Sequence, residues 1–95
     1  THHQLGVLAQ LRGDHDTAHN RYQQALTISE ELGDRAGTAT TYQALGVLAQ
    51  DRGDYDTAHT YYQRALTIFE ELGDRVNIAK VRRNLDILAK DQNDT

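Results

Sequence analysis

The sequence contains no cysteine and no proline among its 95 residues. Without cysteine, neither a disulfide framework nor a zinc site with thiolate ligands can form. The chain also lacks an apolar run long enough to cross a bilayer, and it does not open with the pattern of a signal peptide. We therefore expect no membrane association and, by default, a cytoplasmic location.

Basic residues are fewer than acidic ones: 10 Lys and Arg stand against 14 Asp and Glu, which gives a formal net charge of −4. Binding to nucleic acid or to an anionic membrane needs a concentrated basic face, so neither is expected as the main role. The length allows one domain at most. A content of 38% hydrophobic and 25% charged residues is typical of a soluble globular protein.

Motifs for metal binding, phosphate binding or catalysis are also missing. His15 and His19 lie four residues apart, which is the spacing of a metal half-site on one helix. No cysteine or glutamate completes such a site, and the neighbouring Asp14 and Asp16 are explained as helix-capping or first-turn residues. The sequence has no glycine-rich phosphate loop and no nucleophile motif. We expect no metal, no cofactor and no enzymatic activity.

A repeat with a period of 40 residues runs through the chain, and a weaker third copy begins at Leu85. Such self-similarity is the sequence signature of repeat architectures. The clearest matches are residues 5–10 (LGVLAQ) with 45–50, residues 25–28 (ALTI) with 65–68, and residues 30–35 (EELGDR) with 70–75.

Each copy of the repeat predicts two helices. Tyr42, Leu45 and Leu48 recur at intervals of three, so they share one face of a helix. Gly53 is suited to end that helix in the left-handed conformation, and Asp54 is suited to cap the next helix. Short connections of this kind join antiparallel neighbours. The predicted helices are residues 1–11, 14–32, 34–51, 54–72 and 74–90.

Charged residues near the turns are predicted to form ion pairs with their neighbours in the sequence. Arg35 follows Asp34, and Arg75 follows Asp74, so each pair is expected to form an exposed ion pair worth about 0–1 kcal/mol. Adjacent residues on a helix point apart, so neighbouring glutamates are interpreted as surface charges.

The second copy resembles the tetratricopeptide repeat, in which an aromatic residue, Leu-Gly, a turn glycine and spaced alanines recur in this order. The longer period is similar to that of the extended-hairpin members, such as kinesin light chains, Pins-type polarity adaptors and bacterial signalling proteins. The matching residues are Tyr42, Leu45, Gly46, Ala49, Gly53, Asp54, Tyr55, Ala58, Tyr62 and Ala65, and in the first copy Leu5, Gly6, Gly13, Ala18, Tyr22 and Ala25.

The resemblance implies an all-α fold: an α-solenoid of antiparallel helix hairpins wound into a right-handed superhelix, with about five helices. It implies a single domain over residues 1–95. That domain comprises a truncated first repeat (1–33), a second repeat (34–73), a C-terminal capping helix (74–91) and a frayed tail (92–95). The function implied is a non-catalytic scaffold that binds a peptide or protein segment in the concave groove.

The resemblance also places a set of residues in that groove. Val7 and Val47 stand where extended-hairpin members often carry an asparagine. Lys80 and Arg83 are able to pair with carboxylates; the alternative is that they belong to a solvated, charged final helix. The expected groove residues are Gln4, Val7, Gln10, Thr40, Gln43, Val47, Gln50, Lys80, Arg83, Asn84 and Ile87.

The two ends of the sequence differ from the middle. Asp86 replaces the glycine of Gly6 and Gly46, which is expected to leave the last helix as a polar cap. Thr1 corresponds to Thr41, inside a helix, so we expect the C-terminal part of a longer array. An uncovered N-terminal edge near Leu5, Leu8 and Tyr22 is then expected to favour a homo-oligomer. The alternative function is self-assembly within a larger signalling or regulatory protein.

Overall fold

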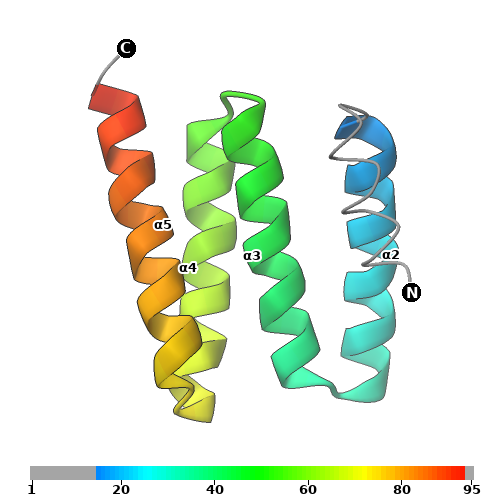
Figure 1. Cartoon of the computed structure of the whole chain (residues 1–95). Coiled ribbons are helices and arrows are strands. Elements are labelled where there is room, and N and C mark those ends of the chain that lie inside the picture. The colour runs from blue at the N-terminus through cyan, green and yellow to red at the C-terminus, as the bar shows by residue number, and fades with distance from the viewer. Residues whose placement is uncertain (1–14, 94–95) are drawn as a thin grey trace.

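The computed structural model describes residues 15–93 and shows four α-helices and no strand within that range. They are α2 (His15–Leu32), α3 (Arg35–Asp51), α4 (Tyr55–Leu72) and α5 (Arg75–Asn93). Successive helices run antiparallel and lie side by side in chain order (Figure 1). In addition, α3 contacts α5, so the first helices of two consecutive repeats are neighbours. The predicted helix at residues 1–11 lies outside the described residues.

The predicted helix bounds agree with the structure to within one residue for α2, α3 and α4. The last helix is longer than predicted, because it continues to Asn93 instead of ending at Lys90. The frayed tail expected at residues 92–95 stays a prediction: Gln92 and Asn93 belong to α5, and the last two residues lie outside the described range. A hydrogen bond of 2.8 Å from the Gln50 amide to Asp91 holds this last turn.

The turns use the chemistry that the sequence predicts. Gly53 has a φ of +78°, a left-handed conformation that a side chain disfavours. The Asp54 carboxylate then accepts a hydrogen bond of 3.4 Å from the backbone N–H of Thr57 and caps α4. The same arrangement recurs at Gly33 with Asp34 and at Gly73 with Asp74.

Helices α3 and α4 approach each other closely at Gly46 in α3. A Cβ atom at this position would lie 2.6 Å from both Cδ1 and Cε1 of Tyr62 in α4. The Tyr62 ring is fully buried, so it has no free space to move into. This contact explains why the repeat carries glycine in the middle of a helix, where glycine is otherwise unfavourable.

Two apolar clusters hold the helices together. One joins α2 to α3, and the other joins α3, α4 and α5. Tyr22 was expected at an uncovered edge, but this is wrong: it is 1% exposed, and burial raises the pKa of its hydroxyl. Leu5 and Leu8 lie outside the described residues, so association through the N-terminal edge stays a prediction. The first cluster contains Ala18, Tyr22, Leu26, Leu45 and Leu48, and the second contains Ala39, Ala49, Ala58, Tyr62, Ala65, Ile68, Phe69, Val81 and Leu88.

The arginines at the turns do not pair with their neighbours as expected. Arg35 pairs with Glu71 and so joins α3 to the end of α4. The adjacent Asp34 carboxylate is instead used to cap α3. In the same way, the Asp74 carboxylate holds Asn77, and these hydrogen bonds lower the pKa of Asp74.

We predict that Gly46→Ala destabilises the chain by about 1–3 kcal/mol, because the added methyl group meets the Tyr62 ring. At an exposed helix position the same change stabilises by about 1 kcal/mol, so the sign of the effect is diagnostic. Urea denaturation followed by circular dichroism measures the change. Thr40→Ala, at an exposed position of the same helix, is the control and should stay within about 0.5 kcal/mol. A Gly46→Ala chain as stable as the parent would contradict the packing.

Candidate functional site

The predicted groove residues that the structure describes fall on two neighbouring helices, α3 and α5. Within each helix their spacing of three and four places them on one side. We call these residues the α3–α5 face. Gln4, Val7 and Gln10 lie outside the described residues. The α3–α5 face comprises Thr40, Gln43, Val47, Gln50, Lys80, Arg83, Asn84 and Ile87.

Some residues of the α3–α5 face are exposed to solvent, whereas others are partly buried by contacts within the fold. Lys80 and Arg83 are exposed, and Ile87 keeps 42% of its surface accessible although it is apolar. Val47 is partly buried because it packs against the core cluster of α3, α4 and α5. The accessible apolar surface of this face is therefore concentrated at Ile87 on α5.

The side-chain amide of Gln50 forms hydrogen bonds within the fold. Its Oε1 atom accepts a hydrogen bond of 2.8 Å from the Tyr62 hydroxyl, and its Nε2 atom donates one of 2.8 Å to Asp91. Gln50 is also one of the predicted groove residues, and the spacing of those residues does not reveal this pairing. The 40-residue period contains a signal for it, because Gln10, Tyr22 and Asp51 stand one period before these three residues.

Six cations of the described range form no ion pair with Asp or Glu: Arg21, Arg64 and Arg75, and three further residues of α5. Within residues 15–93, Lys80, Arg83 and Lys90 form no ion pair with Asp or Glu. All three are exposed. By contrast, the ion pairs found in this range use other arginines: Arg35 with Glu71, Arg52 with Asp16, and Arg82 with Glu70.

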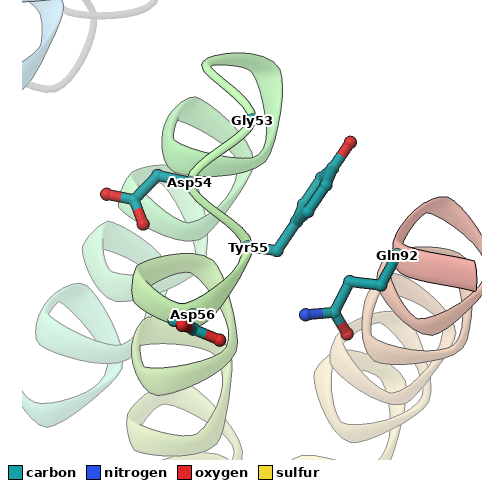
Figure 2. Close-up of a pocket in the computed structure, with 5 residues that line it drawn as sticks. All are labelled: Gly53, Asp54, Tyr55, Asp56 and Gln92. Atoms are coloured by element: carbon teal, nitrogen blue, oxygen red, sulfur yellow. The ribbon is translucent and has the colours of Figure 1, made fainter. Parts of the chain in front are cut away.

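A hollow of about 380 Å³ lies at one end of the bundle, between the α3–α4 turn and the last turn of α5 (Figure 2). Its lining is Gly53, Asp54, Tyr55, Asp56 and Gln92. The Asp54 carboxylate points away from Tyr55 and Gln92 and already caps α4 (Figure 2). Because the polar groups do not converge, the hollow offers no arrangement for acid–base chemistry. Among the described residues, no group of three His, Cys, Asp or Glu side chains could hold a metal.

Two further hollows, of about 320 and 260 Å³, are lined by residues of α2, α3 and α4 and of the turns between them. The larger is lined by His19, Leu45 and Tyr61 among others, and the smaller by Ser29 and Ile68 among others. Neither contains a residue of the α3–α5 face. In the part of the chain that is described, no helix combines the length and the apolar character needed to span a bilayer.

Antiparallel helices whose sequence repeats at a fixed period, with Gly46 packed against the Tyr62 ring, define an α-helical repeat protein. The sequence profile of the tetratricopeptide repeat matches residues 1–71 of the 95. The chain belongs to the tetratricopeptide repeat family. Repeats of this family generally mediate protein–protein interactions and generally form non-catalytic scaffolds.

The fold is similar to the crystal structure of BtubC (BKLC) from P. vanneervenii, with a TM-score of 0.86 and 28% sequence identity. The match covers 96% of this chain but 37% of BtubC, so the chain spans little more than a third of that protein. No curated protein matches the chain.

The buried hydroxyl of Tyr62 predicts a loss of stability at alkaline pH. Burial, followed by the negative charges of Asp51 and Asp91, raises the pKa of Tyr62 from 10.0 to about 12. The unfolded chain therefore releases this proton at lower pH than the folded chain does. The stabilisation from Tyr62 is complete below pH 10 and is lost as the pH rises through 12.

Urea denaturation at several pH values tests this, with Tyr62→Phe as the reference that cannot ionise. The difference in the free energy of unfolding between parent and variant should shrink between pH 10 and 12. A difference that stays constant over this window would contradict the assignment.

Proposed function

We propose that the chain is a non-catalytic interaction module that binds a polypeptide segment carrying carboxylates on the α3–α5 face. The observation that supports this proposal is the cluster of exposed cations on α5. Among the described residues, Lys80, Arg83 and Lys90 form no ion pair, although the charge of Lys80 helps to lower the pKa of Asp74, in a chain whose net charge is −4. A local positive surface on an acidic protein attracts and orients an acidic partner.

The neighbouring residues fit a peptide better than a free ion. Ile87 offers apolar surface beside the cations, so a ligand with an aliphatic or aromatic side chain gains by covering it. The amide of the partly buried Asn84 can both donate and accept, which suits a peptide backbone. Lysine and arginine then form charge-assisted hydrogen bonds with carboxylates of the ligand.

The position of this face within the family fold also supports the proposal. Helices α3 and α5 are the first helices of consecutive repeats, and such helices line the concave wall in a right-handed tetratricopeptide superhelix. We infer that the α3–α5 face belongs to that wall.

Fluorescence anisotropy with labelled synthetic peptides tests the proposal. The probe is a peptide that alternates glutamate and leucine, compared with analogues in which glutamine or lysine replaces every glutamate. We expect the glutamate peptide to bind most tightly and to weaken with added salt. Lys80→Ala with Arg83→Ala should weaken its binding about tenfold, equivalent to about 1.4 kcal/mol.

Arg75→Ala is the matched control, because it removes an exposed cation of α5 that lies outside the α3–α5 face. The control should leave the affinity unchanged. Equal binding of the three peptides, or an equal loss in the control and the double variant, would overturn the proposal.

A further inference from the structure

Three residues from three different helices form a continuous hydrogen-bonded chain. The Tyr62 hydroxyl of α4 donates to Oε1 of Gln50 in α3 at 2.8 Å. Nε2 of Gln50 donates in turn to the Asp91 carboxylate of α5 at 2.8 Å. Tyr62 is fully buried, whereas Gln50 and Asp91 are partly buried. A single side-chain amide thus connects the helix pair of one repeat to the first helix of the next.

The direction of these hydrogen bonds is fixed by chemistry. An ionised carboxylate only accepts, so Asp91 requires the NH₂ group of Gln50 to face α5. The amide oxygen must then face Tyr62, whose hydroxyl donates. Rotating the amide by half a turn would place its oxygen against the carboxylate, which is repulsive. The amide therefore has one favourable orientation, with its oxygen toward α4 and its nitrogen toward α5.

We propose that Tyr62, Gln50 and Asp91 form an inter-repeat clamp that fixes the position of α5 against α3. The apolar contacts of α5 come from Val81 and Leu88, which are fully buried, and from the partly buried Ile78 and Leu85. Apolar attraction is non-directional, whereas a buried hydrogen-bond network specifies one geometry. The clamp acts near the C-terminal end of α5, where the helix continues beyond its predicted end.

The sequence repeats the components of the clamp. Gln10, Tyr22 and Asp51 precede Gln50, Tyr62 and Asp91 by one period each. Gln10 lies outside the described residues, while Tyr22 is buried like Tyr62. Recurrence of all three residue types in register is expected if the clamp belongs to the repeat itself. The proposal does not depend on the nature of the bound peptide, since none of its contacts involves a ligand.

Amide hydrogen exchange followed by NMR on the full chain tests the clamp. Gln50→Leu keeps the size of the side chain but removes the amide. We expect exchange of the backbone amides of residues 86–93 to accelerate at least tenfold, while the amides of α2 keep their rates. Gln43→Leu, the same substitution two turns earlier in α3, is the matched control and should leave the exchange of α5 unchanged.

A second variant separates the clamp from a general loss of stability. Asp91→Ala alters only a partly buried carboxylate and is expected to accelerate exchange in the same α5 residues. Combined with Gln50→Leu, it should add no further acceleration, because either change alone opens the clamp. Independent, additive effects of the two substitutions would overturn the proposal. Exchange in Gln50→Leu no faster than in Gln43→Leu would also overturn it.

If Gln50→Leu fails to fold, as judged by circular dichroism, Asp91→Ala and Asp91→Asn decide the matter. Asparagine can still accept from the Gln50 amide, so Asp91→Asn should retain more protection in α5 than Asp91→Ala. Equal protection in the two variants would contradict the clamp.

Discussion

The contact between the Gly46 backbone and the Tyr62 ring determines how closely α3 and α4 approach. Because a methyl group at Gly46 would lie 2.6 Å from ring carbons, the position accepts glycine alone without rearrangement. The ring fills the space that the missing side chain leaves. It also belongs to the apolar cluster that contains buried residues of α5. The packing of the second repeat therefore depends on one small residue opposite one large one.

Burying this ring also buries a hydroxyl group, which must be hydrogen-bonded or it would destabilise the fold. Gln50 accepts a hydrogen bond from this hydroxyl and donates another to Asp91 on α5. The same tyrosine thus packs one hairpin and, through Gln50, positions the next helix. Lys80, Arg83 and Ile87 remain exposed on α5, where the proposed ligand would contact them.

Much of the fold could be predicted from the sequence because its signals are local. Gly53 with Asp54 identified a turn and a cap, and the spacing of Tyr42, Leu45 and Leu48 identified a helix face. The partners across helices could not be predicted in the same way. Arg35 pairs with Glu71, and Gln50 with Asp91, only because helix rotation and packing bring together residues distant in sequence.

The proposed binding surface is less predictable than the fold, since a groove residue and an internal contact look alike in a sequence. Gln50 and Val47 have the spacing of ligand-binding positions, yet the first is used by the clamp and the second packs against the core. Only the exposure of Ile87 and the absence of ion pairs at Lys80 and Arg83, among the described residues, separate the accessible positions from the rest.

The approach of Gly46 to Tyr62 can be observed directly by NMR in solution. The account predicts strong nuclear Overhauser effects between the Gly46 Hα protons and the Tyr62 ring protons. It also predicts that the ring current displaces those Hα resonances from their usual positions. Gly46 Hα protons with ordinary shifts and no Overhauser contact to the ring would contradict the packing on which the structure depends.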